Sequence, residues 1–253
     1  MPLVIRQFPC LSDNYGFLVR DEASGKTACI DTPDSSAILR ELARAGWRLD
    51  FIFNTHWHPD HAGGNAEVKA ATGAWVVGPA EVRRIANLDR EVGGGDEVEL
   101  GETRFTVIET GGHTLGHIAY FEPAGPTAFV GDTLFALGCG RLFEGTPSQM
   151  WGSLQRLSAL PDETKVYCAH EYTEANARFA LSIDDSVDLK SRSEKVFAAR
   201  QKGEPTVPTT IGEERRTNPF LRAPVLAERV GKRGAPDFEA FGAIRAAKDA
   251  FRG

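Results

Sequence analysis

The sequence predicts an α/β fold that ends in a small helical appendage. Short β-prone runs alternate with segments of helical periodicity along the first two-thirds of the chain. From about Ser182 the sequence pattern changes to charged amphipathic segments and a Pro/Thr-rich linker, and we expect no further strand. A length of 253 residues suits a main domain with such an appendage, and no repeat indicates a solenoid.

The predicted elements follow this alternation in order. The predicted strands cover residues 3–8, 15–20, 27–31, 51–55, 74–78, 103–110, 127–132 and 165–169. The predicted helices cover residues 35–46, 66–73, 148–160, 173–181, 187–203 and 237–251. In the first helix Ile38, Leu39 and Leu42 share one face. We expect Gly46 to end it, because glycine readily adopts the left-handed conformation of a helix C-terminus.

Composition and charge argue against several classes of protein. A net charge of -6 and a pI near 5.6 leave no basic stripe for nucleic acid. No run approaches the ~20 apolar residues of a membrane span, and the N-terminus lacks the features of a signal peptide. The four cysteines are scattered without a CxxC pair, which favours reduced thiols and a cytoplasmic location. We therefore expect neither nucleic acid nor membrane as a partner, and we expect a monomer.

Half of the six histidines fall in one short loop, THWHPDH, at residues 55–61. His56 and His58 are two residues apart and point to the same side of an extended segment. Asp60 and His61 follow at once, after a proline that favours extended geometry at the residue before it. The loop comes directly after a buried-type strand, and ligands gather at the carboxyl ends of strands in α/β folds. So dense a set of His and Asp side chains predicts a metal site.

Three later strand ends add candidate ligands. These are His113 in TGGHTLGH, Asp132 in FVGDTLF and His170 in VYCAHEYT. The full set of predicted ligands is His56, His58, Asp60, His61, His113, Asp132 and His170. A mononuclear catalytic zinc needs three protein ligands and a water, so seven ligands indicate two ions that share a bridging carboxylate. We expect the remaining histidine, His117, to be a hydrogen-bonding support or a core histidine.

Several segments resemble the glyoxalase II (hydroxyacylglutathione hydrolase) family of the metallo-β-lactamase superfamily. The HxHxDH loop, the later histidines and the aspartate of GDTL are typical of the superfamily. DNYGFLV, GCGRLFEGT, AHEYT, NPFLR and IRAAKDAF are similar to the family itself, so the resemblance spans residues 13–251. It implies an αββα sandwich, with a catalytic domain over residues 1–173 and a helical substrate-binding domain over residues 174–253.

The resemblance also implies how the ligands divide. One ion would be held by His56, His58 and His113. The second would be held by Asp60, His61 and His170, with Asp132 as the bridge. Two divalent ions, zinc first with iron or manganese as alternatives, would activate a bridging water as hydroxide, which Asp60 would orient. The implied reaction cleaves the thioester of S-D-lactoylglutathione to D-lactate and glutathione, the second step of methylglyoxal detoxification.

The resemblance implies substrate contacts at five further positions. Arg245 and Lys248 lie three residues apart on one face of the terminal helix, and they match positions that bind the glycine carboxylate of glutathione. Arg141 and Tyr172 match other glutathione contacts. Phe143 stands where some family members have tyrosine, so one hydrogen bond to the substrate would be missing here.

Three alternatives compete with this interpretation. A persulfide dioxygenase of the same superfamily uses one iron and would not need both ligand sets. A lactonase or β-lactamase would leave the pair Arg245 and Lys248 unexplained. A non-catalytic metal-binding module fits poorly, because structural zinc sites are closed by four ligands.

Overall fold

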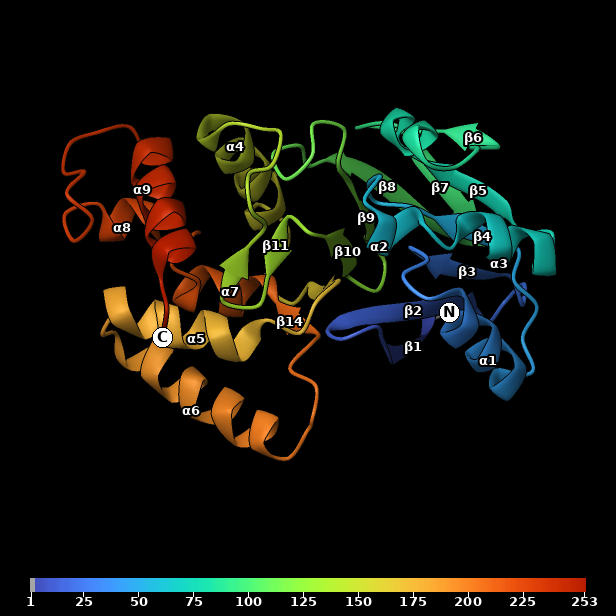
Figure 1. Ribbon diagram of the computed structural model, residues 1–253, viewed down its shortest axis with the longest axis horizontal. Helices are drawn as coiled ribbons and strands as arrows, with labels where there is room; N and C mark the ends of the chain where they lie inside the picture. Colours follow the sequence, from blue (N-terminus) through green and yellow to red (C-terminus); the bar gives the residue numbers. More distant parts are fainter. Residues whose placement is uncertain (1–2) are drawn as a thin grey trace. The chain divides into compact units, whose positions relative to one another are not determined.

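The computed structural model describes residues 3–253, which fall into two compact units (Figure 1). The first unit runs up to Glu109 and also includes Gly116–Gly131. The second unit consists of Thr110–Leu115 and Asp132–Gly253. Across the described residues, no helix combines the length and the apolar character needed to cross a bilayer.

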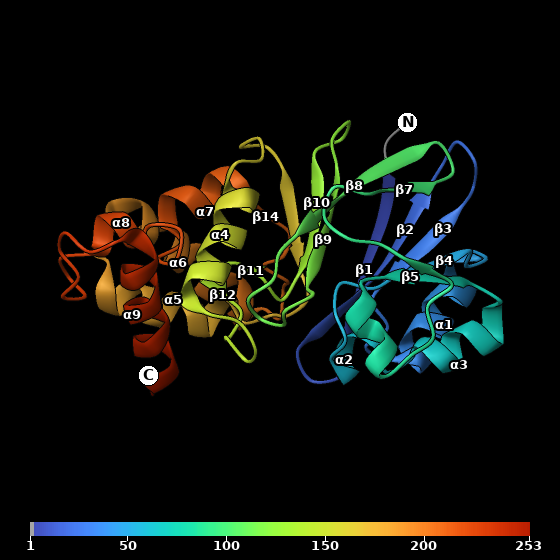
Figure 2. The same cartoon turned by 90° about the horizontal axis from the view of Figure 1, so that it is seen from above.

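The first unit is built around a six-stranded mixed sheet whose strands lie in chain order. The strands are β1 (Leu3–Cys10), β2 (Asn14–Asp21), β3 (Thr27–Ile30), β4 (Phe51–Phe53), β5 (Trp75–Gly78) and β6 (Arg90–Glu91). The first three pair antiparallel, and β3 to β6 pair parallel. Parallel pairing needs crossover connections, and α1 (Ser35–Ala45) and α3 (Asn65–Thr72) supply two of them (Figure 2).

Both crossover helices pack on one face of this sheet. Ile38 and Leu42 of α1 and Val68 of α3 join a buried cluster with residues of β1 to β5. The carboxylate of Asp34 accepts a hydrogen bond from the backbone of α1, and Gly46 ends the helix with a φ of 65°. The predicted helix over residues 35–46 is confirmed together with its C-terminal glycine.

The opposite face of the sheet packs on an antiparallel sheet of the same unit. Its strands are β7 (Glu97–Leu100), β8 (Thr103–Glu109), β9 (Ile118–Glu122) and β10 (Thr127–Gly131). The ring of Phe53 lies 5.4 Å from Tyr120 and 6.1 Å from Phe105. The rings of Phe17 and Phe129 are 5.7 Å apart. Because side chains alternate along a strand, one face of β4 meets the helices and the other forms this aromatic core.

The second unit is mainly helical. Its strands are β11 (Leu134–Phe135), β12 (Gly138–Cys139), β13 (Lys165–Cys168) and β14 (Thr209–Thr210). Its helices are α4 (Pro147–Ser158), α5 (Thr173–Ile183), α6 (Val187–Gln201), α7 (Ile211–Thr217), α8 (Ala223–Leu226) and α9 (Asp237–Ala250). Ala180 and Leu189 pack α5 against α6, and Trp151 of α4 lies 6.1 Å from Phe241 of α9. Two short helices of the first unit, α2 (Pro59–Ala62) and η1 (Ala80–Arg84), complete the elements.

One sequence-based expectation about the second unit is wrong. We expected no strand after Ser182, but β14 pairs antiparallel with β13. Its Thr209 is fixed by a distant partner, since the guanidinium of Arg192 donates to its hydroxyl at 2.9 Å. A two-residue strand has no periodicity of its own, so a tertiary contact rather than a local pattern determines it.

Candidate active site

The loop after β4 brings four predicted ligands together in the first unit. His56 and His61 are buried, whereas His58 and Asp60 are partly exposed. The Nε2 atom of His56 lies 3.1 Å from Nδ1 of His58, and Nε2 of His61 lies 3.6 Å from a carboxylate oxygen of Asp60. The four side chains therefore present their donor atoms close to one another.

Local sequence explains the shape of this loop. Proline at position 59 opens the four-residue helix α2, which carries Asp60 and His61. A Cβ atom on Gly63 would lie 2.3 Å from the carbonyl oxygen of Pro59, so only glycine fits there. The amide of Asn14 donates to the backbone and to the carboxylate of Asp60, at 3.3 and 3.2 Å, and this pair of bonds orients the carboxylate.

Asp31 is a site residue that the sequence reasoning missed. Its buried carboxylate accepts hydrogen bonds at 2.8 Å from the backbone N–H and from the hydroxyl of Thr55. Its second oxygen also lies 2.8 Å from Nδ1 of His61. A carboxylate on Nδ1 fixes the imidazole tautomer that offers Nε2 to a metal. Asp31, His56 and His61 place their ligand atoms within 4.8 Å of one another, and we assign Asp31 the supporting role because it faces Nδ1.

His117 lies in the interior of the first unit, just before β9. Its ring centroid is 4.8 Å from that of His56. Gly131 makes room for it, since a Cβ atom there would lie 2.6 Å from Nε2 of His117. The expectation that His117 supports the site rather than joining the ligand set stays a prediction.

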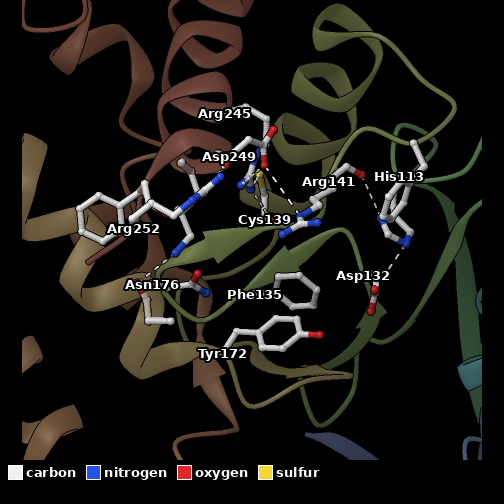
Figure 3. A pocket seen from close by; sticks show the side chains of 14 residues that line it. His113, Asp132, Phe135, Cys139, Arg141, Tyr172, Asn176, Arg245, Asp249 and Arg252 are labelled. Atoms are coloured by element: carbon white, nitrogen blue, oxygen red, sulfur yellow. Dashed lines mark hydrogen bonds and ion pairs between the residues drawn. The ribbon is translucent and has the colours of Figure 1, made fainter.

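Three predicted ligands, His113, Asp132 and His170, lie together in the second unit. Figure 3 shows two of them, His113 and Asp132. Nε2 of His113 is 3.4 Å from one carboxylate oxygen of Asp132, and Nε2 of His170 is 3.4 Å from the other. Nδ1 of His113 lies 2.9 Å from the carbonyl oxygen of Arg141, so that nitrogen carries the proton and Nε2 is the basic one. Asp132 thus has one oxygen directed to each imidazole.

Glycines of the GCGRLFEGT segment shape this group. A Cβ atom on Gly140 would lie 1.9 Å from the carbonyl oxygen of Asp132. A Cβ atom on Gly138 would lie 2.3 Å from the amide of Asn176. The absence of a side chain at position 140 therefore lets the backbone pass beside Asp132, and its absence at position 138 leaves room for Asn176.

The donor set fits divalent metal ions. Two atoms that bind one zinc ion at about 2.1 Å with tetrahedral angles lie about 3.4 Å apart. The two distances from Asp132 to the histidines equal this value and exceed the range of an ordinary N–H···O hydrogen bond. Imidazole and carboxylate groups without cysteine suit zinc, iron or manganese.

A cavity of about 430 Å³ in the second unit begins at His113 and Asp132 and extends along α9. Four cationic side chains line it, namely Arg141, Arg245, Lys248 and Arg252. Tyr172, Phe135 and Phe143 form apolar parts of its wall. Candidate metal ligands and a cluster of cations therefore line one continuous cavity, which suits an anionic molecule whose reactive group reaches the metal side.

The cations of α9 differ in exposure and in partners. The side chain of Arg245 is only 7% exposed, and its guanidinium donates to the carbonyl oxygen of Cys139 and to Asp249, both at 2.9 Å. Lys248 is partly exposed and donates to the carbonyl oxygen of Ala175 at 3.0 Å. Burial, then the charges of Arg245 and Arg141, lower the pKa of Lys248 below its ordinary value of 10.5.

Two aromatic residues connect the cavity wall to metal-ligand candidates. The ring of Tyr172 stacks on His170 with centroids 4.7 Å apart and an interplanar angle of 3°. Phe143 is 62% exposed, and its ring lies 5.2 Å from that of His113. Position 143 thus lies at the cavity, where a tyrosine hydroxyl would be available to a ligand and phenylalanine offers only an apolar face.

The four cysteines are free and buried within the described chain. Burial raises the pKa of the Cys139 thiol, which lines the cavity, to about 11. This thiol is therefore protonated at neutral pH and is a poor nucleophile.

Comparison with known proteins agrees with this architecture. The family model of the metallo-beta-lactamase superfamily matches residues 16–170, and that of the hydroxyacylglutathione hydrolase C-terminus matches residues 171–251. A relative from Maricaulis maris named hydroxyacylglutathione hydrolase is 58% identical over 253 residues, covering 98% of this chain and 99% of its own. A relative of the same name from Methylococcus capsulatus is 50% identical over 255 residues, covering 99% and 100%.

Solved structures give a similar result. ETHE1 from Myxococcus xanthus superimposes with a TM-score of 0.67 at 31% identity, covering 98% of this chain and 99% of its own. The protein TTHA1623, solved in a di-iron-bound form, gives a TM-score of 0.63 at 26% identity, covering 86% and 100%.

The paired sheets, the His and Asp side chains at the strand ends and these matches define a member of the metallo-β-lactamase superfamily. The predicted αββα fold class with its C-terminal helical region is confirmed. Within the superfamily, the chain belongs to the hydroxyacylglutathione hydrolase (glyoxalase II) family of thioester hydrolases.

Proposed function

We propose that this enzyme hydrolyses the thioester of S-(2-hydroxyacyl)glutathione, with S-D-lactoylglutathione giving D-lactate and glutathione. The observation that carries the proposal is that one cavity is lined both by His113 and Asp132 and by a cluster of four cations, two of which are on α9. Glutathione carries two carboxylates, so its thioesters are anions, and a neutral lactone would not require such a cluster. Hydrolysis of methylglyoxal-derived thioesters would place the enzyme at the second step of that detoxification.

We further propose a dinuclear centre built from the seven predicted ligands. His56, His58 and His113 are assigned to one ion, Asp60, His61 and His170 to the other, and Asp132 to both. The family match over residues 16–170 includes all of these positions, and a structural relative is described in a di-iron-bound form. Zinc is our first choice, with iron or manganese as alternatives. Two such ions, when bound, supply Lewis acidity and lower the pKa of a bound water toward about 7.

The side chains of the chain then have distinct tasks. Asp60, whose carboxylate accepts a hydrogen bond from Asn14, is assigned to orient the attacking water as well as to bind metal. The tautomers of His61 and His113 are set by Asp31 and by the carbonyl oxygen of Arg141. The departing glutathione thiolate is a good leaving group, because a thiol pKa near 8.5 is far below that of an alcohol. No dedicated general acid is therefore required.

Substrate binding is assigned to the cationic end of the cavity. Arg245 and Lys248 are assigned to the glycine carboxylate of glutathione, and Arg141 is assigned to a further contact with glutathione. Tyr172 would contact the peptide part of the substrate, and Phe143 would contribute an apolar wall in place of a hydroxyl.

Metal content measured alongside a thioester assay tests this proposal. We expect about two metal ions per chain in fully active protein, and fewer than about 1.5 would contradict the dinuclear centre. Asp132→Ala should abolish hydrolysis of S-D-lactoylglutathione, and near-normal turnover would exclude a bridging role. The alternative, a mononuclear iron persulfide dioxygenase, predicts one iron and oxygen consumption with a persulfide substrate instead.

The remaining proposals concern context. We propose a monomeric, cytoplasmic enzyme, supported by four buried free thiols. We also propose a functional division into a catalytic domain at residues 1–173 and a helical substrate-binding domain at residues 174–253. Size-exclusion chromatography with light scattering tests the first, and expression of residues 1–173 alone tests the second.

A further inference from the structure

Asp249 is an acidic residue among the cations of the anion-binding cavity (Figure 3). Among the described residues that line this cavity, it shares a negative charge only with the metal-ligand candidate Asp132. One of its carboxylate oxygens lies 2.9 Å from Nη2 of Arg245 and 3.9 Å from Nε of Arg141. A carboxylate at this place either competes with the substrate for the cations or holds the cations in position.

The environment of Arg245 decides between these roles. Its guanidinium is nearly buried, donates through Nη1 to the carbonyl oxygen of Cys139, and lies 5.0 Å from the ring centroid of Phe220. A buried cation without a counter-charge is strongly unfavourable. Asp249 supplies that counter-charge from one helical turn away on the same helix, so the pair forms without a long-range rearrangement.

Asp249 is itself held in place. The guanidinium of Arg252 donates to the backbone carbonyl oxygens of Asp249 and Phe251, both at 3.0 Å, and so supports the end of α9. Each Nη atom of Arg245 carries two N–H groups. Nη1 donates to the carbonyl oxygen of Cys139 at 2.9 Å and contacts its Sγ atom at 3.8 Å. Nη2 donates one N–H to Asp249, and its second N–H can be donated to a ligand.

We infer that Asp249 is a positioning residue that fixes the guanidinium of Arg245, and draws the exposed Arg141 toward it, so that both meet one substrate carboxylate. The inference deepens the proposed function and rests on it. The pre-set guanidinium loses little side-chain freedom when the substrate binds. Removing the charge of Asp249 should therefore weaken substrate binding. Electrostatic repulsion alone would predict the opposite, because the site for an anion would then contain one negative charge fewer.

The test compares Asp249→Asn with Asp249→Glu in the full-length, metal-loaded enzyme. The asparagine keeps the shape and one acceptor but removes the charge. We expect its KM for S-D-lactoylglutathione to rise about tenfold with kcat within about twofold. The glutamate retains the charge at a slightly different distance, so we expect a KM only about two- to fivefold above that of the wild type.

Glu239→Gln is the matched control, because it makes the same acid-to-amide change on the same helix. Glu239 pairs with Lys232 at 3.2 Å and lines a different pocket, so its KM should stay at the wild-type value. A second control is a substrate whose glycine carboxylate is amidated. Its KM should be the same in the wild type and in both Asp249 variants, because the proposed contact is absent.

An unchanged or lowered KM in Asp249→Asn would overturn the inference and assign Asp249 the competing role. Thermal unfolding checks that this variant is folded. If it is not, Asp249→Ser, which also removes the charge, takes its place, and an unchanged or lowered KM in that variant would reject the positioning role. If the wild-type enzyme does not hydrolyse the thioester, the proposed function is rejected. If the wild type hydrolyses it and Asp249→Asn has the same KM, only the role of Asp249 is rejected.

Discussion

Asp31→Asn isolates the contribution of one carboxylate to the candidate metal ligands of the first unit. Asp31 has a φ of 56°, a left-handed conformation that asparagine tolerates, so the backbone should not be strained by the change. The native carboxylate accepts three hydrogen bonds of 2.8 Å, two from Thr55 and one from His61. An amide has one acceptor end, so in either orientation its NH₂ group faces a buried donor.

The magnitude follows from these contacts. Losing one hydrogen bond to a charged group costs about 1.5–3 kcal/mol of stability in the metal-free protein. If the NH₂ group faces His61, the imidazole is driven to the tautomer that has its proton on Nε2, which opposes metal binding. Supporting residues of this kind change metal affinity about 10- to 100-fold, which is about 1.4–2.7 kcal/mol.

Competition with a chromophoric chelator measures this effect on metal-free protein. We expect one of two metal equivalents to bind about 10- to 100-fold more weakly in Asp31→Asn. Asp34→Asn is the control from the same loop, since Asp34 caps α1 through Ala37 at 3.0 Å and asparagine caps as well as aspartate does. Unchanged affinity for both equivalents together with an unchanged denaturation midpoint would refute this account of Asp31.

Three other perturbations have defined outcomes. Gly140→Ala places a Cβ atom 1.9 Å from the carbonyl oxygen of Asp132 and should lower the free energy of urea unfolding by about 2–4 kcal/mol. Gly152→Ala within α4 brings its Cβ atom no closer than 3.8 Å to Nη1 of Arg156 and should stabilise the protein by about 0.5–1 kcal/mol. Arg245→Ala should mainly raise KM, and a collapsed kcat with unchanged KM would contradict its binding role. The lowered pKa of Lys248 predicts that KM begins to rise at a pH below that expected for an ordinary lysine, because the ammonium that would attract the carboxylate loses its proton earlier. Lys248→Arg should flatten this rise. The protonated form of Lys248 also costs stability below its folded pKa, and that cost disappears as pH rises through 10.5.

Most of the candidate site could be predicted from the sequence, because ligands in α/β folds gather at the carboxyl ends of strands. His56, Asp132 and His170 each follow a strand, and their chemistry and spacing are visible in the linear chain. Asp31 also follows a strand, so the same rule applied to the run at residues 27–31 would have indicated it. Its partners, Thr55 and His61, are 24 and 30 residues away, so its role as a support for His61 is visible only in the structure.

Other features could not be read from sequence for physical reasons. In the sequence, Asp249 looks like an ordinary solvent-exposed residue of a helix. Its role as a partner of Arg245 is visible only in the structure, where Arg245 is held between Cys139 and Asp249. The need for glycine at position 140 depends on how closely a distant backbone passes. Contacts of this kind arise from tertiary packing and leave no periodic signal.

Two residues that line the cavity of the second unit, Arg141 and Tyr172, also contact metal-ligand candidates. Arg141 contacts His113 through its backbone and Tyr172 contacts His170 through its side chain, so substitutions at the two positions should have different effects. The support of His113 comes from the backbone of Arg141, which Arg141→Ala retains, so this variant should weaken substrate binding and leave metal affinity unchanged. The support of His170 comes from the ring of Tyr172. Stacking of this type contributes about 0.5–1.5 kcal/mol, so Tyr172→Ala should lower metal affinity about two- to tenfold, whereas Tyr172→Phe keeps the ring and should not. Equal metal affinity in both Tyr172 variants would show that the stacked ring does not hold His170.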